Sequence, residues 1–354
     1  NLAEKRFVLF QKTINNRLFI VEPVANIAEL CNQLGLQDKA VHYFSLSIRK
    51  RPEYMKARYG LSGLYADLGF DKNAVREYWE ILRLKRMDLY ACARVIRSYN
   101  DIIVKRKNDG GDATIYIKAR EALRVYLRGL ASAENSKTVD NYALGRACDD
   151  AGDLDAAILA YNKELKGNPR DPLTLLALGN VYFKEKKYDE AIEFYNKTVA
   201  AQPGNKKAYF NLGIAHSALH QYSKAVKSYK KVVALDPQDA AGYFNLGFAY
   251  ENLNLSSEAV FSYGKALVVK PNYYTAYYNL GNVWAKLKNV QKAEQAYRAA
   301  LRIEPNHIES LMNLSIILFD QKEFKEAKEY CKKAQDLGFS PPKEYLEALR
   351  RYGK

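Results

Sequence analysis

One interval of 34 residues organises most of this 354-residue chain. Leu-Gly pairs, alanines and tyrosines recur at this interval, from Leu144-Gly145 to Leu280-Gly281, from Ala157 to Ala327 and from Tyr161 to Tyr297. Prolines recur at the same interval, at Pro169, Pro203, Pro237, Pro271 and Pro305. A shared period among several residue types indicates stacked copies of one supersecondary unit, because a unit of this size cannot bury its apolar face alone.

The residue types at fixed places in the period resemble the tetratricopeptide repeat (TPR) family. The repeat that starts at Pro172 carries Gly179 at position 8, Tyr182 at position 11, Ala191 at position 20, Tyr195 at position 24 and Pro203 at position 32. The resemblance implies two antiparallel helices per repeat, with the first helix of each repeat on a concave side. We therefore expect an all-α fold, a right-handed α-solenoid superhelix of about nine repeats. Small residues at positions 8 and 20 are expected to let the helices approach, and aromatic residues at positions 11 and 24 to fill the space between repeats.

The repeats divide the chain into four predicted segments. Repeats 1 to 3 span 21–137, and the third repeat, at 89–137, is 15 residues longer than a standard one. Its helices are expected to begin near Leu89 and Thr114, with the insertion near 102–114. Repeats 4 to 9 span 138–341 at the regular spacing, and 1–20 and 342–354 flank the array.

The two flanking segments have different predicted roles. Residues 342–354 are expected to form a capping helix with an apolar side, and Ser340 is the predicted N-cap. Residues 1–20 admit two interpretations. Phe10 and Ile14 precede Phe44 and Ile48 by one period, so this segment is either a capping helix or the second helix of a truncated repeat.

The net charge of +15 lies mainly in the first part of the chain. Residues 1–130 hold 24 Lys and Arg against 14 Asp and Glu. Short basic clusters occur at Arg49-Lys50-Arg51, Lys85-Arg86 and Lys105-Arg106-Lys107. A solvated surface explains part of this charge, an acidic protein or a membrane surface is the functional alternative, and nucleic acid is the least favoured partner. No apolar run approaches the ~18 residues of a membrane-spanning helix.

Motifs for catalysis or metal binding are missing from the sequence. It has no phosphate-binding or dinucleotide-binding glycine loop, and no nucleophile elbow. His216 and His220 have metal-ligand spacing, but no third ligand is close in sequence, so structural roles are favoured. An EF-hand that began at Asp109 would need an acidic residue where Arg120 stands. We therefore expect no enzyme activity, metal or cofactor.

The four cysteines occupy packing positions of the repeats and are expected to be buried free thiols. They are Cys31, Cys92, Cys148 and Cys331. This usage is compatible with a reducing compartment. A cytoplasmic location is favoured, or a periplasmic one if an N-terminal signal or anchor was removed.

Amide and aromatic side chains recur on the predicted concave side, and they are the candidate partner-binding residues. The amides are Asn211, Asn245, Asn279 and Asn313 at position 6, and Asn180 and Asn282 at position 9. The aromatic residues, all at position 5, are Tyr142, Phe210, Phe244 and Tyr278. An Asn amide can hold the backbone of an extended peptide with little dependence on its sequence. The row is similar to the asparagine ladder in the TPR part of O-linked N-acetylglucosamine transferases, although Tyr-Asn at these positions is also common in the family as plain scaffold.

The predicted function is a non-catalytic scaffold that binds a protein or an extended peptide in the concave groove. Two alternatives remain open: a substrate-recruiting or regulatory part of a larger enzyme, and a self-assembling component of an envelope or motility structure that forms homo-oligomers. A carboxylate clamp of the kind used by chaperone-binding TPR proteins is not expected in repeats 4 to 9. Arg58 and Arg94 leave a weaker possibility in repeats 2 and 3.

Overall fold

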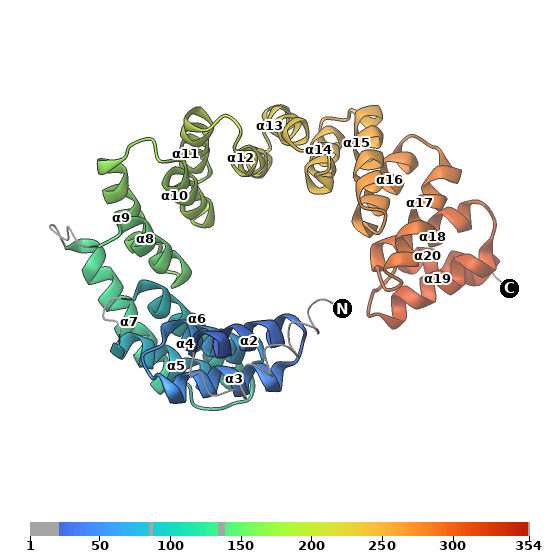
Figure 1. Cartoon of the computed structure of the whole chain (residues 1–354). Helices are drawn as coiled ribbons and strands as arrows, with labels where there is room; N and C mark the ends of the chain where they lie inside the picture. Colours follow the sequence, from blue (N-terminus) through green and yellow to red (C-terminus); the bar gives the residue numbers. More distant parts are fainter. Residues whose placement is uncertain (1–20, 85–87, 134–138, 353–354) are drawn as a thin grey trace. The chain divides into compact units, whose positions relative to one another are not determined.

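A computed structural model describes residues 21–84, 88–133 and 139–352, and all the regular secondary structure in these ranges is α-helical. The chain forms two compact units, Asn1–Pro169 and Arg170–Lys354, which we call the N-terminal unit and the C-terminal unit (Figure 1). Consecutive helices pack in antiparallel pairs, one pair per repeat. The predicted all-α helical repeat fold is confirmed.

Eight described helices build the N-terminal unit. They are α2 (Val21–Gln33), α3 (Gln37–Lys50), α4 (Met55–Asp67), α5 (Asp71–Leu84), α6 (Leu89–Asn108), α7 (Thr114–Ser132), α8 (Asn141–Asp150) and α9 (Leu154–Gly167). The third repeat starts its helices at Leu89 and Thr114, as the sequence predicts. It accommodates its insertion mainly by lengthening both helices, because α6 has 20 residues and α7 has 19, where α4 and α5 have 13 and 14.

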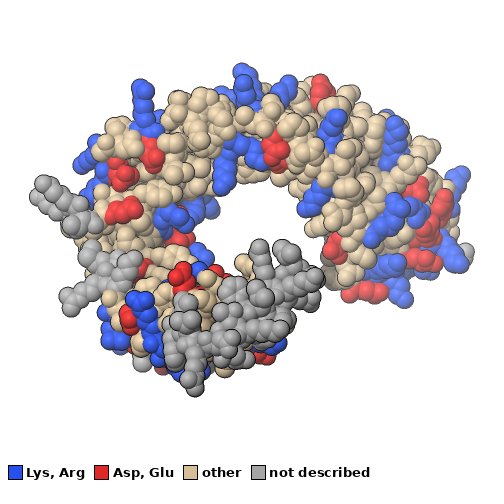
Figure 2. All heavy atoms as spheres, in the orientation of Figure 1, with Lys and Arg blue, Asp and Glu red and all other residues tan. Residues whose placement is uncertain are grey.

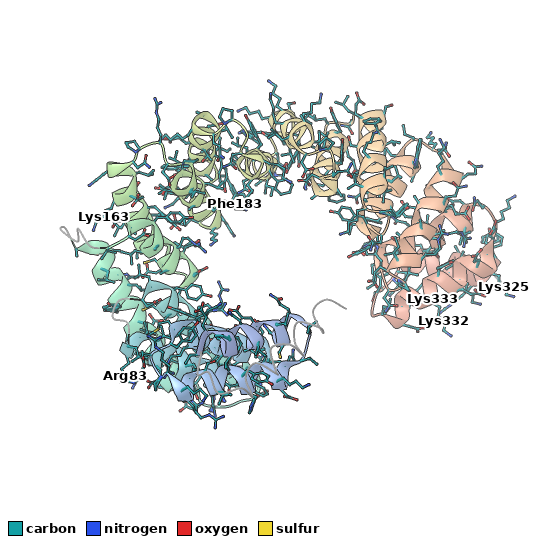
Figure 3. All side chains as sticks on the ribbon, viewed as in Figure 1. Arg83, Lys163, Phe183, Lys325, Lys332 and Lys333 are labelled. Atoms are coloured by element: carbon teal, nitrogen blue, oxygen red, sulfur yellow. The ribbon has the colours of Figure 1, made fainter. Side chains whose placement is uncertain are left out.

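The long helices of the third repeat are tied to the fourth repeat. Helix α6 contacts α8 as well as α7, and α7 contacts α9 as well as α8. Arg97 of α6 pairs with Asp150 at 3.1 Å, and Arg128 of α7 pairs with the buried Asp153 at 2.8 Å. Lys163 of α9, labelled in Figure 3, donates to the carbonyl groups of Ala131 and Ala133 where α7 ends. These contacts keep the fourth repeat in the N-terminal unit, which ends at Pro169.

The C-terminal unit contains five helix pairs and a last helix. They are α10 (Pro172–Lys184), α11 (Tyr188–Ala201), α12 (Lys206–Ala218), α13 (Tyr222–Leu235), α14 (Ala240–Asn252), α15 (Ser256–Val269), α16 (Tyr274–Lys286), α17 (Val290–Ile303), α18 (Ile308–Asp320), α19 (Phe324–Asp336) and α20 (Lys343–Tyr352). The first helices of successive repeats, α10, α12, α14 and α16, also contact one another in turn. Of these, α10, α12 and α14 lie toward the inner side of this unit, and α11, α13 and α15 lie outside them (Figure 1).

The position-24 tyrosines form the centre of each regular repeat. Their rings are almost fully buried in Tyr161, Tyr195, Tyr229, Tyr263 and Tyr297. Each ring lies on the position-8 glycine of its own repeat, so a Cβ atom added at Gly213 would stand 2.4 Å from the ring of Tyr229. The sequence predicts that the position-24 aromatic residues fill the space between repeats. These rings instead fill the space between the two helices of one repeat, because only glycine leaves room for them there.

The turns inside the repeats differ between the two units. Position 15 has a positive φ in every repeat except the third, and in the N-terminal unit it is glycine, at Gly35, Gly69 and Gly152. In the C-terminal unit the same position is held by Lys186, His220, Asn254, Lys288 and Lys322, with φ between 57° and 66°. Side chains with a Cβ atom are strained in this region by roughly 1–2 kcal/mol per residue, so the C-terminal unit has less favourable turns.

The last helix, α20, packs against the final repeat of the array. Leu349 is buried, and Tyr345 and Leu346 pack against the core formed by α17, α18 and α19. The predicted N-cap is wrong, because α20 begins at Lys343 and the exposed Ser340 lies three residues before it. The two interpretations of residues 1–20 fall outside the described residues.

Candidate functional site

The inner side of the C-terminal unit carries a hydrogen-bonded cluster of two amides and one tyrosine. Oδ1 of Asn180, on α10, accepts from the hydroxyl of Tyr195 at 2.9 Å and from Nδ2 of Asn211 at 2.8 Å. Tyr195 comes from α11 and Asn211 from α12, so the cluster joins the fifth repeat to the sixth. We call this arrangement an Asn–Asn–Tyr triad.

The same triad recurs three repeats further along the chain. Oδ1 of Asn282 accepts from the hydroxyl of Tyr297 at 2.7 Å and from Nδ2 of Asn313 at 3.0 Å. Both triads use position 9 and position 24 of one repeat and position 6 of the next. The local reason is that consecutive first helices are in contact, which places position 9 of one helix against position 6 of the following helix.

The contacts between repeats 6 and 7 and between repeats 7 and 8 are built differently. The hydroxyl of Tyr263 donates to Glu251 at 2.7 Å and accepts a longer bond of 3.4 Å from Asn279. Asn245 is not part of a triad, because its Nδ2 donates to the backbone carbonyl of Ala241 in its own helix at 2.9 Å. The predicted asparagine row thus contains two interlocked pairs, one amide at a Tyr–Glu contact and one amide bonded to its own helix.

The triads leave polar groups without a described partner. Each position-9 amide accepts two hydrogen bonds through Oδ1, which leaves both N–H bonds of its Nδ2 open. The position-6 amides keep Oδ1 open, and Asn211 also keeps one N–H open, whereas Nδ2 of Asn313 donates a second, longer bond of 3.3 Å to the hydroxyl of Tyr297. Asn180, Asn211, Asn282 and Asn313 are half-buried, so these open groups face the inner side at a partly dry surface.

Burial fixes the protonation of the tyrosines in the triads. It raises the pKa of Tyr297 to about 12, and the hydrogen bond from Asn313 opposes this shift. Burial also raises the pKa of Tyr195 well above its usual range. An ordinary tyrosine is already protonated at neutral pH, so the raised pKa extends donation from both hydroxyls to the position-9 amide oxygen into the alkaline range.

The predicted aromatic residues at position 5 lie against the tyrosines of position 24. Ring centroids are 5.9 Å apart for Phe210 and Tyr229, 5.7 Å for Phe244 and Tyr263, and 6.2 Å for Tyr278 and Tyr297. The position-5 rings are half-buried, so part of each ring remains accessible beside the amide row. Tyr142 makes the same contact with Tyr161 at 6.0 Å, but it belongs to the N-terminal unit.

Sequence reasoning missed the hydroxyl groups that hold the amides. The repeat pattern indicates only a packing role for Tyr195 and Tyr297, and it gives no role to Glu251. One signal does lie in the sequence. Position 24 is tyrosine in all four repeats that precede an asparagine at position 6. The signal is not specific, because Tyr78 and Tyr161 precede Arg94 and Ala177 at that position.

The two arginines of the possible carboxylate clamp are held by the protein itself. Arg58 is buried, pairs with Glu77 at 2.7 Å and donates to the carbonyl of Pro52. Arg94 donates to the hydroxyl of Tyr78 at 2.8 Å and lies over its ring. Neither guanidinium is arranged to receive a peptide carboxylate.

The cysteines are buried free thiols as predicted, and the two histidines with metal-ligand spacing contact neighbouring side chains. His216 is buried and contacts Gln221, whereas His220 is exposed and contacts the hydroxyl of Tyr222. The described residues contain no group of three His, Cys, Asp or Glu side chains able to hold a metal. All four cysteines are free and buried, and burial raises the pKa of Cys92 and Cys148 to about 12.

Charged side chains are dispersed over both units. Figure 2 shows Lys and Arg along the surface with Asp and Glu between them. Of the basic clusters in the sequence, Lys85-Arg86 lies outside the described residues. No helix in the described ranges is long and apolar enough to cross a bilayer.

Comparison with known proteins places most of the similarity in the C-terminal unit. Family models of the tetratricopeptide repeat match residues 171–238 and 210–272. A model of the middle TPR-like domain of cilia and flagella-associated protein 70 matches residues 243–338. A search of curated proteins gives no match, and the resemblance of the asparagine row to O-linked N-acetylglucosamine transferases stays a prediction.

Similar solved structures include two forms of MamA and the protein YrrB. One MamA structure is 30% identical over 46% of this chain and 94% of its own, with a TM-score of 0.45. MamA of Desulfovibrio magneticus RS-1 is 20% identical over 49% of this chain and 99% of its own, with a TM-score of 0.46. YrrB, described as a TPR protein with an unusual peptide-binding site, is 19% identical over 55% of this chain and 98% of its own, with a TM-score of 0.46. The 34-residue period, the helix pairs and the two matching family models together show that the chain is a tetratricopeptide repeat protein.

Proposed function

We propose that this protein is a non-catalytic interaction scaffold that binds an extended peptide segment along the inner side of the C-terminal unit. The observation that carries the proposal is the pair of Asn–Asn–Tyr triads, each with open amide groups on half-buried side chains. The family match supports the scaffold role, and the peptide groove is our inference from the geometry.

The physical basis is preorganisation of the amides. An amide whose oxygen is already held by a tyrosine hydroxyl and a second amide loses little rotamer freedom when it binds a peptide. Its two open N–H bonds suit peptide carbonyl groups, and the open oxygen of the position-6 amide suits a peptide N–H. Because these contacts are to backbone, the groove would select extended conformation more than sequence.

The accessible parts of Phe210, Phe244 and Tyr278 supply apolar contact beside the polar row. Aromatic rings bury large area with little conformational loss, so they provide affinity where the amides provide geometry. Tyr142 lies in the other unit and is left out of this proposed groove.

A variant that removes the position-6 amides tests the groove. Peptides selected on the wild-type protein by phage display are measured by fluorescence anisotropy against the Asn211→Ala, Asn245→Ala, Asn279→Ala, Asn313→Ala variant. The loss of several net hydrogen bonds of about 1 kcal/mol each predicts at least tenfold weaker binding. Unchanged affinity would contradict the proposal.

A control variant changes asparagines away from the inner side. Asn196, Asn272 and Asn306 are exposed, and their joint replacement by Ala is expected to leave affinity unchanged. Asn245→Ala alone separates binding from stability. Its amide bonds only to its own helix, so its removal is expected to weaken binding without lowering the urea midpoint of the C-terminal unit.

The family match at 243–338 favours one of the cellular alternatives. We propose, as a second candidate, that the scaffold serves an assembly of the cilium or flagellum, in line with the protein for which that model is named. Imaging of a fluorescently tagged chain in ciliated cells tests this setting. Exclusion of the tagged chain from the organelle contradicts it and leaves the groove untouched.

A further inference from the structure

The insertion in the third repeat builds a pocket at the surface of the N-terminal unit. The pocket has a volume of about 460 Å³ and lies between the α4–α5 turn and the end of α6. From the turn and the start of α5 it receives Gly69, Phe70, Lys72 and Asn73. From the end of α6 and the loop after it, it receives Ile102, Lys105, Arg106, Asp109 and Gly111.

The pocket exists because α6 is longer than a standard first helix. A helix of the 13 residues seen in α4 would end at residue 101, and every residue that α6 gives to the pocket lies beyond that point. Helix α5 packs against α6, so the added turns of α6 project past the α4–α5 turn. Standard repeats lack these added turns, and with them this wall of the pocket.

The base of the pocket is apolar. Phe70 is 55% exposed, although it is a large aromatic residue, and its ring has one edge contact with Tyr65 at 6.3 Å. Ile102 is buried beside it. The partly exposed ring of Phe70, with the buried Ile102 in the same pocket, forms an apolar surface that can bind one apolar side chain of another molecule.

The rim of the pocket is basic. The lining includes three cations, Lys72, Lys105 and Arg106, and one carboxylate, that of Asp109, while the carboxylate of Asp112 interacts with Arg106 from outside the lining. Lys72 and Lys105 are exposed, and in the described part of the chain neither has a carboxylate within 4 Å. Arg106 is held in place by a bond to the carbonyl of Asp112 at 3.2 Å and by the ring of Tyr116, 5.2 Å from its guanidinium.

We propose that this pocket is a second docking site, which binds a short acidic segment of a partner protein through one apolar anchor residue flanked by carboxylates. The apolar base receives the anchor, and the rim cations pair with the flanking acids. Charge complementarity selects this occupant, because the rim carries three cations against one anion and the base is apolar. The site is independent of the proposed groove, which lies in the other unit.

The test uses a short fluorescein-labelled peptide with a central phenylalanine between runs of glutamate, followed by anisotropy with the full chain. The Lys72→Glu, Lys105→Glu variant is expected to bind at least about tenfold more weakly, since close charge pairs become like charges. A matched control, Lys107→Glu with Lys118→Glu, changes the net charge equally at exposed sites outside the pocket and is expected to stay within about twofold of wild type.

A second peptide tests the anchor. Serine in place of the central phenylalanine is expected to weaken binding at least tenfold, because burial of an aromatic side chain is lost. Equal binding of the two peptides, or equal loss in the two charge variants, overturns the proposal. Binding that disappears in the four-asparagine variant would assign the peptide to the groove and overturn it as well.

A binding experiment with lipid vesicles distinguishes an acidic protein partner from a membrane surface. Phosphatidylserine vesicles that bind wild type but not the Lys72→Glu, Lys105→Glu variant, with no binding of the phenylalanine peptide, overturn the proposal in favour of a lipid surface. Circular dichroism of all variants confirms that the exposed substitutions leave the helices intact. A negative result for the pocket does not contradict the proposed peptide groove, because Lys72 and Lys105 lie outside that groove.

Discussion

The N-terminal and C-terminal units solve the same packing problem with different residues. The N-terminal unit closes its turns with glycine, stabilises its second repeat with the buried Arg58–Glu77 pair, and varies its helix lengths. The C-terminal unit keeps a uniform repeat and links neighbouring repeats through tyrosine hydroxyls and asparagines. The comparison shows that a regular lattice can repeat one polar arrangement along its surface, whereas a change of helix length produces a feature that occurs once, such as the pocket at the end of α6.

Each unit holds one of the two tryptophans, so its unfolding can be followed separately. Trp79 lies on α5 and Trp284 on α16. Single-tryptophan variants, Trp284→Phe or Trp79→Phe, therefore report the urea midpoint of one unit at a time by fluorescence. The stability predictions below use this pair of reporters.

The buried ion pair of the N-terminal unit should give the largest effect. Glu77→Ala leaves the Arg58 charge buried without its partner and is expected to cost about 3 kcal/mol of unfolding free energy. The counterpart in the C-terminal unit is Glu326→Ala, which breaks the half-exposed pair with Arg298 and should cost less than about 1 kcal/mol. Equal losses from the two variants would break the comparison between buried and exposed pairs.

Overpacking the lattice of the C-terminal unit comes next. Gly213→Ala places a Cβ atom 2.4 Å from the ring of Tyr229 and is expected to cost about 1–3 kcal/mol. Gly264 lies inside α15, where an added Cβ atom would meet no other atom within 4 Å, so Gly264→Ala should stabilise the unit by up to about 1 kcal/mol. The Trp284 reporter checks both, and a stabilising Gly213→Ala would refute the Tyr–Gly packing.

Exchanging lysine and glycine at position 15 of the turns is expected to change the stability of the two units in opposite directions. Lys288→Gly relieves a positive φ of 58° and is expected to raise the stability of the C-terminal unit by about 1 kcal/mol. Gly69→Lys introduces the same strain at a φ of 74° and should lower the stability of the N-terminal unit by a similar amount. Shifts of the same sign in both urea midpoints would show that turn strain does not distinguish the units.

A pH dependence should be the smallest difference. Burial lowers the pKa of His216 below its ordinary value of 6.5, while the charge of Lys224 also lowers it and the bond to Gln221 raises it. Because the unfolded chain binds the proton more readily, the stabilisation is complete above pH 6.5 and is lost as the pH falls below it. The urea midpoint of the C-terminal unit should therefore fall between about pH 7 and pH 5, and less so in His216→Gln.

The N-terminal unit supplies the comparison for this effect, since its described histidine, His42, is exposed. Its midpoint, read from Trp79, should lack the contribution of a buried histidine. An identical fall with pH in wild type and His216→Gln would remove His216 as the cause.

Much of the fold could be predicted because the 34-residue period specifies local geometry directly. The start of α6 at Leu89 follows from counting 34 residues from the start of α4 at Met55, whereas the start of α7 at Thr114 lies off this count because of the insertion. The N-cap prediction at Ser340 fails because consecutive prolines leave the start of a helix ambiguous, and here the helix begins only after Pro342. The division after Pro169 could not be foreseen, because it depends on which helices touch across repeats and not on residue types.

The lattice positions of the candidate residues could be predicted, but their hydrogen bonds could not. The position of Asn180, Asn211, Asn282 and Asn313 on first helices follows from the lattice, whereas their mutual hydrogen bonds depend on the distance between neighbouring helices. That distance is fixed by side-chain packing. Asn245 shows the limit, since it has the same lattice position as Asn211 but bonds to its own helix.

The lengthened helices of the third repeat also have a consequence for how the array opens. In a linear array, the strength of each interface decides whether local unfolding stops or spreads. Because α6 and α7 reach α8 and α9 directly, opening of the third repeat exposes two interfaces at once. These four helices should exchange their amide hydrogens as one cooperative block, and fraying that begins at α2 should halt at its edge.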